Sequence, residues 1–415
     1  MNPKHSQGLS RAAGLVPAMR VLDSENQVDM RSLRKYRLER VKEQLRKRDV
    51  GLMILTDPIS IRYATGYRNW ALFQTHCVSY YVFISPDGPT FLFGYSAKEP
   101  PLETIDECRV GAAISHFNAG PHMERSAAKF ANDVISYLKA HGAGSTKIAI
   151  EQFTPSVSRE LVTASLTVID ASPIVETARV IKSADEVLCM NFSIAVAEAG
   201  VARMREACKP GITEEELWAL LHETNIAKGG EWIEARLLAS GDRTNPWGQE
   251  ASSRIISAGE LVAFDTDMIG PFGYCADISR TFFCGPGKPT EEQRNLYKLA
   301  YEEIQHNTSI IRPGVTFYEL SQKCFKLPDQ YIGNRYSCLC HGLGLCDEYP
   351  KIAHPADWEA RGYDGIVEEG MVLCVESYVG AAGGNQGVKL EEQILVTSGG
   401  YRLLSKFPFE ESLLA

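Results

Sequence analysis

The sequence predicts an α+β protein of two domains, in which an α/β domain is followed by a domain rich in β-strands. Its 415 residues exceed the size at which one hydrophobic core keeps growing. Apolar residues make up 44% of the chain and charged residues 23%, a mixture typical of globular proteins. Helical and strand-like patterns alternate in the first half, and strand-like patterns predominate later. We therefore expect a poorly ordered arm of residues 1–29, a first domain of residues 30–180 and a second domain of residues 181–415.

The first domain is predicted to begin with an amphipathic helix. Leu33, Val41 and Leu45 follow a helical pattern after Met30, and an apolar strand comes next, over residues 51–56. The tripeptide Pro86-Asp87-Gly88 is a turn signal that joins two strands into a hairpin. The other predicted elements are strands at residues 79–85, 89–93 and 147–150 and helices at residues 123–141 and 156–164.

The second domain is predicted to open with two helices and to continue mostly as strands. Ser183 is placed to cap a long helix that reaches Cys208. After the break at Pro210-Gly211, a helix begins at Thr213 with three glutamates in its first turn. The predicted strands lie at residues 235–239, 260–268, 274–284, 371–379 and 388–397.

Charge and composition exclude several functional classes. The net charge is −9, and the basic residues between 34 and 48 alternate with acids, so we expect no nucleic-acid partner. We find no apolar run of the length of a membrane span and no signal-peptide core, and we expect a cytoplasmic protein without a membrane partner. The 11 cysteines have no paired zinc spacing and are expected to be reduced thiols.

Acidic residues interrupt the apolar strands of the second domain. Asp265 and Asp267 are two residues apart, so a strand would place them on the same face, and Asp277 follows in the next strand. Glu376 and Glu391 stand in the last two strands. Because unpaired buried carboxylates are costly, we expect these acids to converge on a cation. Any one of them alone would be read as a solvated residue or an ion-pair partner.

One histidine completes the predicted metal centre. His341 is followed by Gly342 and Gly344, which would let the backbone approach closely. Four or five carboxylate oxygens with one imidazole suit Mn²⁺, Fe²⁺, Co²⁺ or Zn²⁺. Glu392 is left out, since strand alternation should turn it to the opposite face from Glu391. The predicted ligands are Asp265, Asp277, His341, Glu376 and Glu391.

These residues and their order resemble the pita-bread metalloenzymes, the superfamily of methionine aminopeptidase, aminopeptidase P, prolidase and creatinase. The resemblance covers residues 30–415. It implies a C-terminal pita-bread domain, an N-terminal creatinase-type α/β domain and a homodimer. It also implies that Asp277 and Glu391 bridge two ions, that Asp265 binds one, and that His341 and Glu376 bind the other. The motifs are Asp277-Ile-Ser-Arg-Thr281, His341-Gly-Leu-Gly344, Glu369-Gly370-Met371 and Lys389-Leu390-Glu391.

Two departures separate the chain from the peptidases of this superfamily. Those peptidases carry a second histidine soon after the ligand histidine, where Asp347 stands here, and a histidine before the first aspartate, where residues 240–247 contain none. With the additional Asp267, these departures resemble the DddP-type dimethylsulfoniopropionate lyases, which release dimethyl sulfide and acrylate, typically with iron. The resemblance implies iron as the metal, Asp267 as a further ligand, Asp347 as the base and Tyr336 beside the substrate.

The small-molecule substrate implied by this resemblance is a sulfonium carboxylate. A sulfonium cation is best held by aromatic faces, and Trp70, Phe73, Trp247 and Tyr336 are the candidates, although such aromatic residues more often serve plain core packing. The β-elimination needs one base, and Asp347 qualifies if burial and neighbouring acids raise its pKa. Two alternatives stay open: a metal-dependent hydrolase of the X-Pro aminopeptidase or creatinase type, and a pita-bread domain that binds without catalysis.

Overall fold

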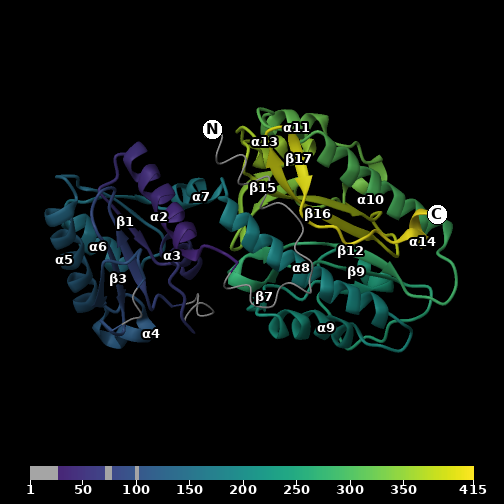
Figure 1. The fold of residues 1–415 in the computed structure, drawn as a ribbon, viewed down its shortest axis with the longest axis horizontal. Helices are drawn as coiled ribbons and strands as arrows, with labels where there is room; N and C mark the ends of the chain where they lie inside the picture. The colour runs from purple at the N-terminus through teal and green to yellow at the C-terminus, as the bar shows by residue number, and fades with distance from the viewer. Residues whose placement is uncertain (1–26, 71–76, 99–101) are drawn as a thin grey trace. The chain divides into compact units, whose positions relative to one another are not determined.

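The computed structural model describes residues 27–70, 77–98 and 102–415, which form two compact units (Figure 1). One unit consists of Asp29–Arg179, and the other of Val180–Ala415 together with Val28. Most of the predicted arm, residues 1–26, and the predicted site residue Phe73 lie outside the described residues. Each unit has its own hydrophobic core.

The N-terminal unit is a six-stranded mixed sheet with helices, in the strand order β4-β3-β2-β1-β5-β6. The predicted hairpin is confirmed, since β2 and β3 pair antiparallel with Tyr81 opposite Phe93. The predicted helices are confirmed as well. The elements are α2 (Met30–Lys47), β1 (Leu52–Leu55), α3 (Pro58–Thr65), β2 (Tyr81–Ile84), β3 (Thr90–Gly94), β4 (Glu107–Val110), α4 (His116–Ala119), α5 (Met123–His141), β5 (Lys147–Ile150), α6 (Pro155–Thr163), β6 (Thr167–Asp170) and α7 (Ser172–Arg179).

The core of this unit lies between α5 and the inner strands. Phe130 and Val134 of α5 pack with Tyr81 and Phe83 of β2, and the rings of Tyr81 and Phe93 stack with centroids 4.7 Å apart. The edge strands β4 and β6 escape the sequence prediction. Their side chains are half exposed, so they lack the apolar pattern that marks the buried strands.

The C-terminal unit opens with two capped helices, as predicted. Ser183 caps α8 (Ala184–Ala207) through a reciprocal pair of hydrogen bonds with Glu186, and Thr213 caps α9 (Glu214–Ala227) in the same way. By length and composition α8 could cross a membrane, which the sequence analysis did not anticipate. However, 72% of its apolar window is buried inside the protein, as in the core helix of a globular domain.

Mostly strands follow α9, as predicted, but the helix α10 (Glu291–Ser309) of 19 residues among them was not predicted. Two signals for it are present in the sequence. Thr290 and Gln293 form a capping box, and Leu296, Ala300 and Ile304 recur at helical spacing. The shorter helices of the unit are α11 (Phe317–Lys323), α12 (Asp329–Ile332), α13 (Trp358–Arg361) and α14 (Glu411–Leu414).

Three antiparallel sheets form the body of the C-terminal unit. The largest has the order β14-β13-β15-β16-β17, and the others have the orders β11-β10-β7 and β12-β9-β8. The predicted strands at residues 371–379 and 388–397 are confirmed as β15 and β16. The strands are β7 (Trp232–Ile233), β8 (Leu238–Ser240), β9 (Leu261–Phe264), β10 (Met268–Ile269), β11 (Cys275–Ala276), β12 (Arg280–Phe283), β13 (Cys340–Leu343), β14 (Asp347–Ile352), β15 (Val372–Val379), β16 (Val388–Thr397) and β17 (Gly400–Leu403).

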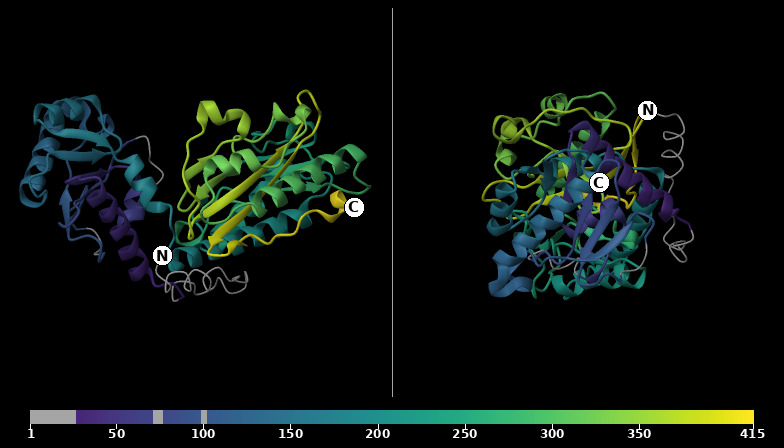
Figure 2. Two further views of the ribbon diagram at one scale, coloured as in Figure 1. Left: turned by 90° about the horizontal axis from the view of Figure 1, so that it is seen from above. Right: turned by 90° about the vertical axis from the view of Figure 1, so that its left-hand side faces the viewer.

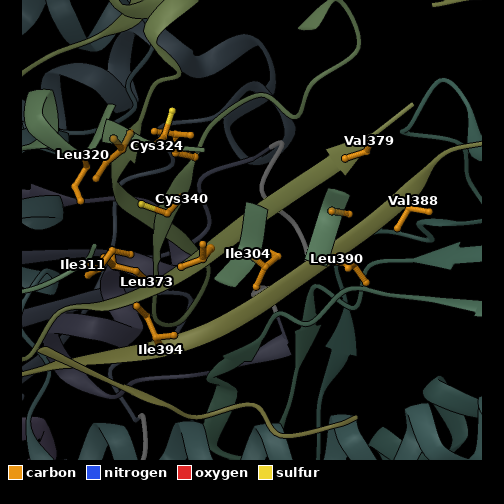
Figure 3. Packing of buried hydrophobic residues seen from close by; sticks show 14 of the residues in the cluster. Ile304, Ile311, Leu320, Cys324, Cys340, Leu373, Val379, Val388, Leu390 and Ile394 are labelled. Carbon is orange, nitrogen blue, oxygen red and sulfur yellow. The ribbon is translucent and has the colours of Figure 1, made fainter. Parts of the chain in front are cut away.

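The paired strands β15 and β16 present two chemically different faces. Figure 2 shows them in yellow, with the green helix α10 against them. On the face toward α10, Leu373, Leu390 and Ile394 belong to an apolar core that includes Ile304 of the helix (Figure 3). Because side chains alternate along a strand, the opposite face carries the residues one position further along, among them Glu391.

Candidate metal centre

Glu376 and Glu391 stand at the middle of the polar face of β15 and β16. They are direct cross-strand partners, and they are 1% and 0% exposed. Their carboxylates therefore lie side by side in the interior. Glu392 points to the other face, as predicted, and pairs there with Arg280 at 2.7 Å.

Asp265 and Asp267 reach the same place from a bend in the chain. The predicted strand of residues 260–268 is wrong at its end, because β9 stops at Phe264 and Asp267 has a φ of 35°. The predicted strand of residues 274–284 is also broken, and Asp277 lies between β11 and β12. The three aspartates nevertheless offer carboxylate oxygens that all lie within 4.8 Å of one another.

His341 joins the acids from β13, the strand next to β15. Its Nε2 lies 3.2 Å from Glu376 Oε1, and it is 3.8 Å from Asp277 Oδ2 and 3.9 Å from Glu391 Oε1. The pairing of β13 with β14 shifts directly after His341. A Cβ atom on Gly342 would lie 2.5 Å from the Tyr349 carbonyl oxygen, so the predicted close approach of the backbone requires this glycine.

The structure brings all six predicted metal ligands together in three overlapping sets. Within each set the potential ligand atoms all lie within 4.8 Å of one another. Sequence reasoning missed one member, the thiol of Cys374, although alternation along β15 places it on the same face as Glu376. The sets are Asp277, His341, Cys374 and Glu391; Asp265, Glu376 and Glu391; and Asp265, Asp267 and Asp277.

Unsatisfied oxygens in this cluster fit a divalent cation. Asp265 Oδ1 and Glu391 Oε1 are buried, and neither has a hydrogen-bond partner among the residues that the structure describes. A buried carboxylate oxygen without a partner is costly unless a cation binds it. Carboxylate oxygens with one imidazole are the donors that Mn²⁺, Fe²⁺, Co²⁺ and Zn²⁺ accept. These residues therefore form a site that could hold a divalent metal.

The protonation of the cluster also responds to charge. Burial, followed by the charge of neighbouring acids, raises the pKa of Asp277 and of Glu391 well above the usual range. Burial and the charge of Asp265 raise the pKa of Asp267 to about 8. Burial would lower the pKa of His341, but the hydrogen bond with Glu376 and other nearby groups raise it to about 9. Because metal ligands must be deprotonated, binding of a metal would release protons here.

A lysine lies among the ligands, and sequence reasoning gave it no role. The Lys389 side chain is fully buried, and its Nζ is 2.6 Å from Glu376 Oε2, 3.0 Å from Asp265 Oδ2 and 3.4 Å from Glu391 Oε2. Burial would raise the pKa of Asp265, but the charge of Lys389 lowers it overall. The position of Lys389, two residues before Glu391 in the same strand, was a signal that the two side chains share a face.

Asp347 stands at the start of β14, on the open side of the cluster. Its Oδ1 lies 3.6 Å from His341 Nδ1, the ring nitrogen that does not face Glu376. Partial burial and the charge of Glu376 raise the pKa of Asp347, and the charge of His341 opposes them. Its side chain is 58% exposed, so water screens part of these interactions. Asp347 therefore combines contact with the cluster and access to solvent.

The four predicted aromatic residues are found in different places. Lys389 Nζ lies 4.5 Å from the ring centroid of Tyr336 and 5.7 Å from that of Trp247, so both rings already face a cation. Trp70 belongs to the N-terminal unit, where its ring stacks on Tyr95 with centroids 6.2 Å apart. Phe73 lies outside the described residues. The C-terminal unit thus brings Tyr336 and Trp247 beside the metal centre.

The chain is similar to known metalloenzymes along most of its length. The model of metallopeptidase family M24 matches residues 189–398, and that of the creatinase/prolidase N-terminal domain matches residues 37–181. A dimethylsulfoniopropionate lyase DddP from Roseovarius nubinhibens is 39% identical over 395 residues, 93% of this chain and 88% of that protein. A second DddP, from Roseobacter denitrificans, is 35% identical over 396 residues with the same coverage of both chains.

Solved structures agree with this relationship at the level of the fold. An Xaa-Pro dipeptidase from Bacillus anthracis has a TM-score of 0.73 and 23% identity, and the match covers 91% of this chain and 99% of that one. The predicted fold class, a pita-bread domain after a creatinase-type α/β domain, is thereby confirmed. From the two domain matches and the identity to full-length relatives, we conclude that the chain belongs to metallopeptidase family M24, within the pita-bread superfamily.

Proposed function

We propose that the chain is a metal-dependent lyase that cleaves dimethylsulfoniopropionate to dimethyl sulfide and acrylate by β-elimination. The observation that carries this proposal is Asp347. By the sequence resemblance it stands where the peptidases have their second histidine, and in the structure it lies 3.6 Å from His341 and is open to solvent. The identity of 39% to a lyase over 93% of the chain supports the same reaction. We take iron as the preferred metal, by likeness to this group of lyases.

The elimination needs few groups from the protein. A bound divalent metal would withdraw negative charge from the substrate carboxylate. Asp347 removes a proton from the carbon next to that carboxylate, the electron pair forms the new double bond, and the C–S bond breaks. Dimethyl sulfide leaves as a neutral molecule and needs no acid. The raised pKa makes Asp347 a stronger base, and its exposure lets it return the proton to water.

The substrate's two charged ends call for different surroundings. Its carboxylate suits a divalent cation held by the ligand sets, because the ammonium of Lys389 is already occupied by three carboxylates. Its sulfonium suits aromatic faces. Tyr336, Trp247, Trp70 and Phe73 remain our proposed substrate-binding residues, and the first two have the stronger support because they lie within the unit that holds the metal centre.

A hydrolase of the X-Pro peptidase type is the second candidate. The intact set of ligands favours it, because these residues would hold a divalent metal that would activate water for hydrolysis without a protein base. The two reactions give different products, so one assay separates them.

The deciding experiment is a headspace measurement on iron-loaded protein. We expect dimethyl sulfide from dimethylsulfoniopropionate and no cleavage of X-Pro dipeptides. Asp347→Asn should keep the metal content of the wild type and reduce turnover by about 10²–10⁴-fold, since that is the usual contribution of a general base. His341→Ala should lose metal and turnover together. Cleavage of X-Pro dipeptides without sulfide release, or full turnover by Asp347→Asn, would contradict the proposal.

A further inference from the structure

One of the three sets of ligand atoms already faces a cation that belongs to the protein. The set of Asp265, Glu376 and Glu391 surrounds the ammonium of Lys389 at distances of 2.6 to 3.4 Å. The hydroxyl of Ser279 lies 2.6 Å from the same nitrogen. Lys389 is therefore held by three carboxylates and a hydroxyl in a fully buried position.

The ammonium contacts one oxygen of each of these carboxylates and does not occupy the other. It binds Asp265 Oδ2, Glu376 Oε2 and Glu391 Oε2. Among the described residues, Asp265 Oδ1 and Glu391 Oε1 have no hydrogen-bond partner, and Glu376 Oε1 lies 3.2 Å from His341 Nε2. Asp265 and Glu391, whose second oxygens have no partner, each belong also to one of the other two ligand sets, which contain Asp277, Asp267 and His341.

The charge of Lys389 also matches the number of acids. The centre holds five carboxylates, from Asp265, Asp267, Asp277, Glu376 and Glu391. Two divalent ions would neutralise four of them. The ammonium supplies the remaining positive charge, which is the one that the additional Asp267 requires.

We propose that Lys389 is a positioning residue of the metal centre: its ammonium is a built-in cation that fixes one oxygen of each of three ligand carboxylates and keeps the other oxygens available for metal. The site is thereby preorganised before metal arrives. This inference rests on the metal centre of the proposed function and is independent of the reaction that we assign to it, because it concerns metal binding and stability without substrate.

The test compares the unfolding temperature of metal-free and iron-loaded protein for the wild type and for Lys389→Met. Without the ammonium, the carboxylates of the metal-free variant repel one another, and metal relieves that repulsion. We therefore expect a large drop for the metal-free variant and a small drop for the loaded one, so that the metal-induced rise grows by at least about twofold. Lys389→Arg retains the charge and should keep the metal-free protein near the wild type.

Lys182→Met is the matched control. Lys182 is also buried, but Glu348 is its one ion-pair partner in the part of the chain that the structure describes, at 2.9 Å with side-chain exposures of 2% and 1%. Its loss should lower the unfolding temperature equally with and without metal. Equal drops for Lys389→Met would overturn the proposal. If Lys389→Met does not fold even with metal, Lys389→Arg decides: a metal-free protein near the wild type supports the proposal, and equal drops in both states overturn it.

The two proposals fail in different ways. If the protein releases no dimethyl sulfide but Lys389→Met gives the expected shift, the proposal of a built-in cation is supported and the proposal of a lyase is contradicted. If the protein releases dimethyl sulfide but Lys389→Met behaves like Lys182→Met, the proposal of a lyase is supported and the proposal of a built-in cation is contradicted.

Discussion

Two neighbouring glutamates on β16 are both buried from solvent but differ in the partners of their carboxylate oxygens. Glu392 is 4% exposed and is paired inside the protein, with Arg280 at 2.7 Å and with the hydroxyl of Ser405. Glu391 is 0% exposed, and its Oε1 has no partner among the described residues. Burial alone therefore does not distinguish a structural acid from a metal ligand. The distinction comes from which oxygens the protein itself satisfies.

The same contrast extends to the two faces of the β15–β16 pair. On the face toward α10, apolar side chains such as Leu373 and Ile394 pack with the helix, and the hydroxyl of Ser377 donates to Glu303 at 2.7 Å. On the opposite face, carboxylates gather around Lys389 with oxygens left over. A well-packed apolar face can fix the backbone that holds the acidic face together, so the two faces depend on each other.

The largest expected effect comes from Glu391, the glutamate that belongs to the metal centre. Glu391→Gln keeps the shape of the side chain but removes the charge that two ligand sets share, so we expect loss of both metal and turnover. Metal content by mass spectrometry after dialysis and the headspace assay measure the two losses. If Glu391→Gln retains the metal content of the wild type, the acidic face is not the metal centre.

Glu392→Gln should lower the stability of the protein and leave its metal content unchanged. Arg280 would keep its hydrogen bonds to the carbonyl oxygens of Glu391 and Phe407 but lose its charged partner, and breaking a buried ion pair costs about 3–5 kcal/mol. We expect a loss of unfolding free energy in that range, or below it because of the remaining bonds, with metal content unchanged. Denaturant unfolding of the variant and the wild type measures it. Loss of metal from Glu392→Gln at unchanged stability would contradict the separation of the two faces.

The sequence predicted this separation where alternation in a strand is regular. Over residues 388–397 strand alternation places Glu391 and Glu392 on opposite faces, and the structure agrees. It failed where the backbone leaves the regular pattern, as at Asp267, whose positive φ no residue pattern announced. The convergence of these acids with His341 joins chain segments far apart in the sequence. The cost of burying unpaired carboxylates predicted it, and the family resemblance added which ligand would bind which ion.

Lys389 and α10 were missed for two other reasons. A lysine in a strand is ordinarily exposed, and nothing in the sequence says that three carboxylates will surround it. For α10 the signals were present, in the capping box at Thr290 and the helical spacing of its apolar residues. They lie within a part of the chain for which mostly strands were predicted.

The last prediction concerns the pH dependence of the face toward α10, where the expected change is small at each step of pH. Burial, assisted by the charge of Glu376, raises the pKa of Glu303 from 4.5 to about 8. Between these two pH values the folded protein keeps the proton and the unfolded chain releases it. This stability is therefore fully present below pH 4.5 and is lost as the pH rises toward 8, by at most about 1.4 kcal/mol per pH unit.

Glu303→Gln carries no such proton, so its stability relative to the wild type should increase with pH across that window. Unfolding free energies at several pH values measure this, with Glu302→Gln, at an exposed position on the same helix, as the control. Parallel pH profiles for Glu303→Gln and the wild type would mean that Glu303 is ionised in the folded protein and would contradict its raised pKa.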